Sequence, residues 1–232
     1  MYTPIQLQLA DGRPFGIYTT FPLTKPKGMI MVLHEAFGIT PHIERVCAQY
    51  SAAGLVCAAP ALLMPSTGQP HGVVLPQNKQ GLDEARRLII GTERKDLYAI
   101  LQTTAAWGAA QGGEEVLPVA ALGYCWGGSC AYVAGVVVPN LKAVISYYGG
   151  QLAQLCVEAQ PKCPTLIHLA TADRYIPLNP TTAALSQHHP AAKVYIYDAD
   201  HGFNRDDGKT YNPAAATLAF QRSLDFINQS IA

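Results

Sequence analysis

A cysteine stands in this chain where a well-known catalytic turn carries serine. Positions 123–127 read Gly-Tyr-Cys-Trp-Gly, which is the G-x-S-x-G nucleophile elbow with sulfur in place of oxygen. The apolar run 116–122 precedes the motif and the small-residue segment 127–131 follows it, so we expect a strand, a sharp turn and a helix. At that helix N-terminus the dipole and the free N–H groups favour a thiolate and a developing oxyanion. The alternative is that Cys125 is a buried structural cysteine between two turn glycines.

A nucleophilic thiol needs a base, and the base needs a group that orients it. Asp173 follows the predicted strand 165–169, and His201 follows the predicted strand 193–197 by four residues. The carboxyl ends of strands in an open α/β sheet are where ligands bind. A lone loop histidine is usually a solvated surface residue, but the order Cys, Asp, His is that of the α/β-hydrolase triad. The sequence therefore predicts Cys125, Asp173 and His201 as a catalytic triad.

Competing assignments for these roles are weaker. Asp198 and Asp200 lie close to His201 only along the chain, and Asp173 occupies the usual position of the acid. Ser129 falls inside the predicted helix rather than at the turn, which favours helix packing. His34 and the glutamate after it lack the second histidine of an H-E-x-x-H zinc helix, so that motif is excluded.

The loop after the first buried strand reads His-Glu-Ala-Phe-Gly at positions 34–38. In the elbow architecture this loop supplies one oxyanion N–H, and the residue after the nucleophile supplies the other. We therefore expect the Trp126 N–H and the N–H of Ala36 or Phe37 to form an oxyanion hole. Glu35 is the unusual member, since a buried carboxylate is costly unless it is paired. It would pair with a surface lysine, contact the thiol, or contact an arginine that binds substrate.

Strand-like and helix-like segments alternate along the chain and indicate one doubly wound α/β domain over 1–232. Segments 5–9 and 15–20 predict an N-terminal antiparallel hairpin around an Asp-Gly turn. Short apolar runs predict strands buried in a parallel sheet, and these are 29–33, 55–59, 116–122, 143–147, 165–169 and 193–197.

Helix start signals lie between the predicted strands. Thr40, Asn179 and Asn212 are each followed by proline, which predicts an N-cap and a first helical residue at each position. Thr92 is the predicted cap of another helix. The stretch 60–80, rich in proline and glycine, is the least regular part of the chain. An irregular segment of this length is more often functional than idle, so it is either a lid over a site or a plain surface excursion.

Composition narrows the classes of protein and of partner. The 232 residues include 16 basic and 16 acidic side chains, so charge gives no reason to expect nucleic acid or an anionic membrane as partner. The first 15 residues lack the features of a signal peptide, and no run of 18 apolar residues exists. Six cysteines without a C-x-x-C pair favour reduced thiols in the cytoplasm over disulfides. No cofactor and no metal are expected.

With these residues, the chain resembles the dienelactone hydrolase (carboxymethylenebutenolidase) family. The resemblance rests on Glu-Ala-Phe-Gly at 35–38, the elbow at 123–128, Tyr-Tyr-Gly at 147–149, Asp173 with Pro177, and His-Gly-Phe at 201–203 with Arg205. It implies a monomer with the α/β-hydrolase fold: a mostly parallel central sheet, helices on both faces and the N-terminal hairpin. It also implies a Cys-Asp-His triad that opens a small unsaturated lactone bearing a carboxylate.

The resemblance assigns further roles by position. Glu35 is similar to the family's thiol-partner glutamate, and Arg205 is similar to one of two arginines that hold the substrate carboxylate. Arg86 or Arg87 is the candidate for the second arginine. Substrate-binding roles for aromatic side chains at matching positions are implied for Phe37, Tyr148 and Phe203. The family's Pro-Asp-Leu-Tyr is replaced here by Pro-Ala-Leu-Leu at 60–63, which makes the predicted pocket wall more apolar.

Two functions follow as hypotheses. The first is a cysteine-dependent hydrolase of small lactones or esters, which works through a thioester on Cys125. The second is a non-hydrolytic protein on the same fold that uses Cys125 for redox sensing or ligand binding, because one fold hosts many functions. The complete triad favours the first, since a sensor thiol requires neither a base nor a group to orient it.

Overall fold

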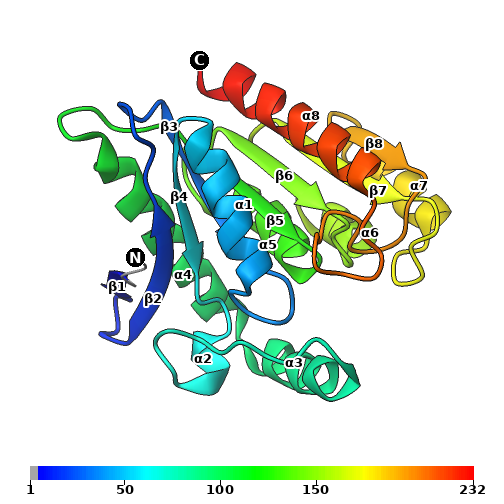
Figure 1. Ribbon diagram of the computed structural model, residues 1–232, viewed down its shortest axis with the longest axis horizontal. Coiled ribbons are helices and arrows are strands. Elements are labelled where there is room, and N and C mark those ends of the chain that lie inside the picture. The colour runs from blue at the N-terminus through cyan, green and yellow to red at the C-terminus, as the bar shows by residue number, and fades with distance from the viewer. Residues whose placement is uncertain (1–4) are drawn as a thin grey trace. The chain divides into compact units, whose positions relative to one another are not determined.

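The computed structural model describes residues 5–232 (Figure 1). Its residue contacts divide the chain into two units. The first comprises the chain up to Val119 together with Val137–Pro139, and the second comprises Ala120–Val136 and Asn140–Ala232. Both units are α/β in character, and each is described in turn.

The first unit holds the N-terminal strands in the order β1-β2-β4-β3. Their bounds are β1 (Ile5–Gln8), β2 (Pro14–Thr20), β3 (Gly28–Leu33) and β4 (Leu55–Pro60). β2 pairs antiparallel with both β1 and β4, whereas β3 and β4 are parallel. The predicted N-terminal antiparallel hairpin is therefore confirmed. Every residue of β3 and β4 is buried, as expected for strands covered on both faces.

Helices cover both faces of this part of the sheet. α1 (Pro41–Ala52) packs on the strands and so does α4 (Arg94–Ala109), whereas α2 (Met64–Thr67) and α3 (Lys79–Gly91) pack on each other. The short 3₁₀ turn η1 (Ala110–Gly112) follows α4. Figure 1 shows α1 in front of β4 and α4 behind it. α1 begins as predicted, with Thr40 as N-cap and proline at its first position.

The prediction that Thr92 caps a helix is wrong. Glu93 is the N-cap of α4, and Thr92 instead follows the last residue of α3. Its hydroxyl donates back to the Leu88 carbonyl at 2.9 Å, which satisfies one of the acceptors that a helix C-terminus leaves open. A threonine between two helices can hydrogen-bond the end of the first or the start of the second, and here Thr92 bonds the end of α3.

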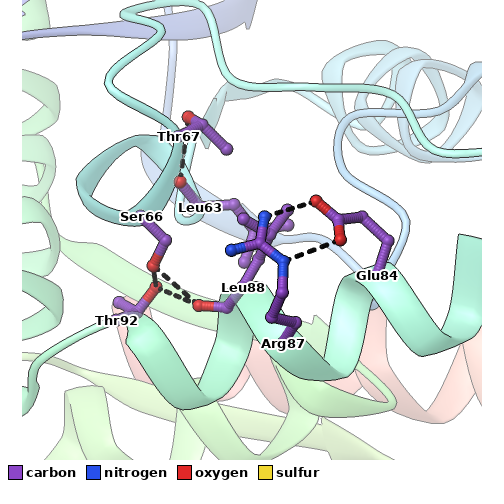
Figure 2. A network of polar contacts seen from close by, with 7 residues as sticks. All are labelled: Leu63, Ser66, Thr67, Glu84, Arg87, Leu88 and Thr92. Carbon is purple, nitrogen blue, oxygen red and sulfur yellow. Dashed lines mark hydrogen bonds and ion pairs between the residues drawn. The ribbon is translucent and has the colours of Figure 1, made fainter.

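The stretch 60–80 is not structureless, because it contains the short helix α2. Figure 2 shows how α2 is attached to the end of α3. The Ser66 hydroxyl donates to the Leu88 carbonyl at 2.7 Å and lies 2.6 Å from the Thr92 hydroxyl. On the same helix, Arg87 forms a two-point ion pair with Glu84 at 2.8 and 2.5 Å. These contacts give the segment a defined place within the first unit.

The second unit holds four parallel strands in the order β5-β6-β7-β8. They are β5 (Val119–Tyr124), β6 (Ala143–Tyr147), β7 (Thr165–Ala170) and β8 (Lys193–Tyr197). The prediction that 193–197 is a buried strand is wrong: β8 is the last strand in this order, and of its residues only Tyr197 is buried. The helices are α5 (Trp126–Val137), α6 (Leu152–Glu158), α7 (Leu178–His188) and α8 (Pro213–Ile231). The prediction that Asn179 is an N-cap is also wrong, because the first turn of α7 closes from the Pro177 carbonyl to the Thr181 N–H at 3.1 Å and Asn179 lies inside the helix. β5 starts three residues later than the apolar run suggested. Pro118 has no N–H for a ladder, and its carbonyl accepts from the Met29 N–H at 2.9 Å.

Opposite faces of β6 meet different helices. A Cβ added to Gly128 of α5 would lie 2.9 Å from the Ser146 hydroxyl, which shows how closely this helix approaches one face. The next residue, Tyr147, points the other way and its hydroxyl lies 2.8 Å from that of Ser223 in α8. Figure 1 shows α8, in red, running along β6 and β7. Helices on both faces of a mostly parallel sheet are thus confirmed.

The start of the last helix has a clear physical reason. Asn212 is the N-cap of α8 and accepts the Ala215 N–H at 3.1 Å, which confirms the prediction from its Asn-Pro sequence. None of the helices in residues 5–232 combines the length and the apolar character that a bilayer crossing requires.

Candidate active site

Cys125 sits at the turn between β5 and α5. Its backbone φ is 55°, a left-handed value that non-glycine residues seldom adopt. The strain is held by hydrogen bonds on both sides: its N–H donates to the Tyr147 carbonyl at 3.0 Å and its carbonyl accepts from the Gly128 N–H at 2.9 Å. The side chain is half-buried rather than enclosed. The strand, strained turn and helix that the G-x-C-x-G motif predicts are therefore present.

The first glycine of the motif is required by close approach of the backbone. A Cβ on Gly123 would run into the carbonyl oxygen of Gly127 at the start of α5. Neither atom belongs to a flexible side chain, so only a shift of the helix or the strand would relieve the clash.

Gly123→Ala is accordingly expected to lower the free energy of unfolding by about 1–3 kcal/mol, the usual cost of overpacking, and to reduce any reaction that depends on the turn. Gly150→Ala is the matched control, because a Cβ there meets no atom within 4 Å. Urea unfolding of the two variants measures the difference. Equal stabilities for both would contradict the role of Gly123.

Asp173 and His201 meet in the loops after β7 and β8. The His201 Nδ1 lies 2.7 Å from Asp173 Oδ2, and the two side chains are 15% and 1% exposed. The other oxygen, Oδ1, accepts the N–H groups of Tyr175 and Ile176 at 2.9 and 3.1 Å. The backbone of its own loop therefore fixes one carboxylate oxygen of Asp173, and the other oxygen faces the imidazole of His201. The structure brings together the predicted acid and base.

The backbone of His201 is held as firmly as its ring. Its N–H donates to Asp200 Oδ1 at 2.6 Å, and its carbonyl accepts from the Thr210 hydroxyl at 2.7 Å. The ring lies near two tyrosines, with centroids 5.0 Å from Tyr148 and 5.0 Å from Tyr175. These contacts limit the imidazole to small movements, which a proton-transfer group requires.

The electrostatics of His201 join it to both predicted partners. Burial lowers the pKa of His201, but hydrogen bonds to Asp173 and Cys125 outweigh burial and raise that pKa to about 10. The imidazole is therefore protonated at neutral pH.

Two of the aromatic residues predicted to bind substrate are fully buried. Tyr148, with a left-handed φ of 40°, packs its ring against His201. Phe203 contacts Tyr148 at 5.3 Å and Tyr197 at 5.1 Å between ring centroids. Both residues pack against other aromatic rings near His201. Their role in contacting substrate stays a prediction.

The predicted substrate arginine lies four residues beyond the base. Arg205 is 21% exposed, and its Nε lies 3.4 Å from Asp207 Oδ1. A substrate carboxylate would therefore compete with a local carboxylate for this guanidinium.

Trp126 is the first residue of α5, in the second unit, and the remaining predicted site residues belong to the first unit. Glu35 and Ala36 are buried directly after β3, and Phe37 is half-buried. Arg86 lies on the exposed face of α3, 60% exposed and 3.5 Å from Asp83. Arg87 pairs with Glu84 on the same helix (Figure 2). Each arginine thus has a carboxylate partner one turn away, and the assignment of either to substrate binding stays a prediction.

Comparison with known proteins identifies the family. The model of the dienelactone hydrolase family matches residues 15–231. The chain belongs to this family. A carboxymethylenebutenolidase of Pseudomonas sp. (strain P51) is 26% identical over 234 residues, which cover 97% of this chain and 94% of the relative.

Solved structures support the α/β-hydrolase fold of this dienelactone hydrolase family member. A crystal structure from Klebsiella pneumoniae has a TM-score of 0.82 at 24% identity and covers 99% of both chains. The dienelactone hydrolase of Anabaena variabilis has a TM-score of 0.72 at 17% identity, with 100% of this chain and 99% of that one covered. The predicted fold class is confirmed, and a hydrolase acting on ester or lactone bonds is supported.

The remaining thiols differ from Cys125 in their surroundings. All six cysteines are free, and Cys130, five residues further along α5, is buried. Burial raises the pKa of the Cys130 thiol, and it raises the pKa of Cys163 to about 11. Both therefore stay protonated and inert at neutral pH, whereas Cys125 lies beside a histidine.

Tyr175 was not among the predicted site residues. The residue is 50% exposed, its ring lies edge-on to His201, and the Arg174 guanidinium lies 5.1 Å from the ring centroid. The available signal was its position two residues after Asp173, inside the loop that carries the acid. An exposed aromatic next to the base is placed to contact whatever binds at the imidazole.

Proposed function

We propose that this dienelactone hydrolase family member is a cysteine-dependent hydrolase of small lactones or esters, with Cys125, His201 and Asp173 as its catalytic triad. One observation carries the proposal. The His201 Nδ1 lies 2.7 Å from the buried carboxylate of Asp173, and the His201 side chain also hydrogen-bonds Cys125. This is the nucleophile, base and orienter arrangement of covalent catalysis.

The proposed reaction proceeds in two stages. The Cys125 thiolate attacks the acyl carbon, and the imidazolium of His201 gives its proton to the departing alkoxide oxygen as the carbon–oxygen bond breaks. In a lactone this opens the ring and leaves the product joined to sulfur as a thioester. His201, now neutral, takes a proton from water, which attacks the thioester and releases the carboxylic acid. Asp173 keeps the Nδ1 proton in place, so that Nε2 faces the reaction.

The proposed oxyanion hole combines the N–H of Trp126, the first residue of α5, with the N–H of Ala36, just past β3. One donor follows the nucleophile and the other comes from the loop after an early strand, as in other α/β-hydrolases. Loss of one such donor typically costs about 10²–10³ in rate.

The proposed substrates carry a carboxylate beside the bond that is cleaved. In the proposal, Arg205 binds that carboxylate and Glu35 is the partner of the thiol. A carboxylate next to sulfur disfavours the thiolate by like-charge repulsion. Binding of an anionic substrate at Arg205 would shift Glu35 and release the thiolate only when substrate is present.

A hydrolysis screen tests the proposal across carboxylated lactones, neutral lactones and simple esters such as p-nitrophenyl acetate. Turnover is expected, with the highest kcat/KM on carboxylated lactones. Arg205→Gln is expected to raise KM for the carboxylated lactones about tenfold, the loss of a modest charge-assisted bond, and to leave neutral esters unchanged. No turnover on any substrate would favour the alternative of a redox-sensing or ligand-binding thiol.

Several other expectations remain part of the proposal. They are a monomer, a cytoplasmic location with reduced thiols, a single domain over 1–232, and a lid role for 60–80.

A further inference from the structure

His34 is a buried histidine with a hydrogen-bond partner on each ring nitrogen. It follows β3 directly and is 1% exposed. Its Nδ1 lies 2.6 Å from the carbonyl oxygen of Glu35, the next residue. Its Nε2 lies 3.2 Å from the backbone nitrogen of Leu62, just past the end of β4. Both partners belong to the backbone, so the ring links two loops at the ends of neighbouring parallel strands.

These partners determine which nitrogen carries the proton. A carbonyl oxygen only accepts, so Nδ1 must donate to Glu35. A backbone N–H only donates, so Nε2 must accept from Leu62. The ring is therefore neutral with its proton on Nδ1. Burial agrees with this, because it lowers the pKa of His34 to about 4.

The bond to the Glu35 carbonyl also fixes the direction of the next N–H. The carbonyl of Glu35 and the N–H of Ala36 belong to one planar trans peptide, in which they point in opposite directions. Because the Glu35 carbonyl points toward the His34 ring, the Ala36 N–H points away from that ring. If the peptide turned over, the carbonyl would leave His34 and face the place where the N–H had been.

The far end of this loop is held separately. Gly38 has a left-handed φ of 85°, and a Cβ there would run into the carbonyl of Val73. The Phe37 carbonyl accepts the Leu75 N–H at 2.9 Å. His34 therefore holds the Glu35–Ala36 peptide, which carries the Ala36 N–H, while Gly38 and Leu75 hold the other end of the loop.

We infer that His34 is a positioning residue that keeps the Glu35–Ala36 peptide in the orientation in which its N–H serves the oxyanion hole. The inference rests on the proposed function, because it gives that N–H its task. His34 touches no reacting atom and acts only through the peptide. The buried neutral imidazole is suited to this, since a charged ring would set a donor against the Leu62 N–H.

Two substitutions separate the two hydrogen bonds. The Asn amide places a donor near the position of Nδ1, so His34→Asn retains the bond to the Glu35 carbonyl and loses the one to Leu62. The Gln amide places an acceptor near the position of Nε2, so His34→Gln retains the Leu62 bond and frees the carbonyl. Each variant loses one hydrogen bond and part of one ring, so their stabilities in urea are expected to be similar.

The rates are expected to differ although the stabilities do not. For the ester or lactone that the screen finds most active, His34→Gln should lower kcat about 10–100-fold with little change in KM, somewhat less than outright removal of a donor. His34→Asn should stay within about threefold of the parent, because its amide keeps the carbonyl held. Affinity for a trifluoromethyl ketone, which forms an oxyanion when a thiolate adds to it, should fall in His34→Gln by the same factor as kcat/KM.

Equal kcat values for the two variants, or a loss in KM rather than kcat, would overturn the inference. So would unchanged affinity of His34→Gln for the trifluoromethyl ketone. These outcomes are distinct from failure of the proposed function, in which Cys125→Ala would keep its activity. A parent enzyme that depends on Cys125 but treats the two His34 variants alike would overturn only the positioning role.

Discussion

Replacing Cys125 by alanine is expected to reduce ester hydrolysis by about 10⁴-fold or more, because removal of the nucleophile leaves only binding and the oxyanion donors. The structure gives the reason: the thiol is at a strained turn with a φ of 55° and hydrogen-bonds a protonated His201. The measurement is kcat/KM on p-nitrophenyl acetate, together with mass spectrometry of enzyme quenched during turnover. The parent should show an acyl group on the peptide that contains Cys125, and the variant should show none.

Cys130→Ala is the matched control for that experiment. Cys130 lies in α5, the helix that begins directly after Cys125, but it is buried, and burial raises the pKa of its thiol. Its replacement removes a thiol from α5 without touching His201, so activity within about twofold of the parent is expected. Undiminished hydrolysis by Cys125→Ala, or acylation found on Cys130 instead, would refute the assignment of the nucleophile.

The strands could be predicted because each is a short apolar run that ends in turn residues. β6 and β8 have the predicted bounds, and β3, β4 and β7 differ by one residue at an end. β5 was predicted to begin too early because hydropathy does not record that Pro118 lacks an N–H. The cap of α8 was predicted correctly at Asn212, but the same Asn-Pro pattern failed at Asn179, because α7 begins from Pro177 two residues earlier. Thr92 lies between two helices, and local sequence does not say which one it serves.

The meeting of Asp173 and His201 could also be predicted, for a topological reason. Each follows a strand, and β7 and β8 are parallel neighbours, so the loops at their carboxyl ends are adjacent. The surroundings of the imidazole could not be predicted in the same way. Tyr148 reaches it through a left-handed backbone, and Phe203 turns into the core two residues after the base. Side-chain direction in irregular loops depends on tertiary contacts that no local pattern encodes.

His34 illustrates the same limit. Its sequence neighbourhood suggested at most a zinc motif, which the spacing excludes. Its hydrogen bond to Leu62 joins positions 28 residues apart and depends on β3 and β4 lying side by side. A histidine whose two nitrogens are both occupied by backbone is visible only once both strand ends have been placed.

Replacing Asp173 by asparagine is expected to reduce kcat by about 10⁴-fold without unfolding the chain. Asparagine can still accept the N–H groups of Tyr175 and Ile176 through its amide oxygen. The amide NH₂ would then face His201 Nδ1, and Nδ1 would have to accept rather than donate. The imidazole would hold its proton on Nε2, the nitrogen that serves the reaction, in the wrong tautomer for a base. Asp198→Asn is the control, because the Asp198 carboxylate accepts the exposed Thr171 hydroxyl at 3.2 Å and is not one of the groups that raise the pKa of His201.

The same substitution should change the pH profile of kcat/KM. Hydrogen bonds to Asp173 and Cys125 raise the pKa of His201 to about 10, so the parent should keep its imidazolium, and its activity, until the pH rises through that value. Without the negative charge of Asp173 the folded-state pKa of His201 must fall, because that charge favours the protonated ring and burial opposes it. The alkaline limb of Asp173→Asn should therefore move to lower pH, while that of Asp198→Asn stays in place. An alkaline limb that did not move, or a loss of kcat equal in the two variants, would mean that Asp173 does not set the charge and tautomer of the base.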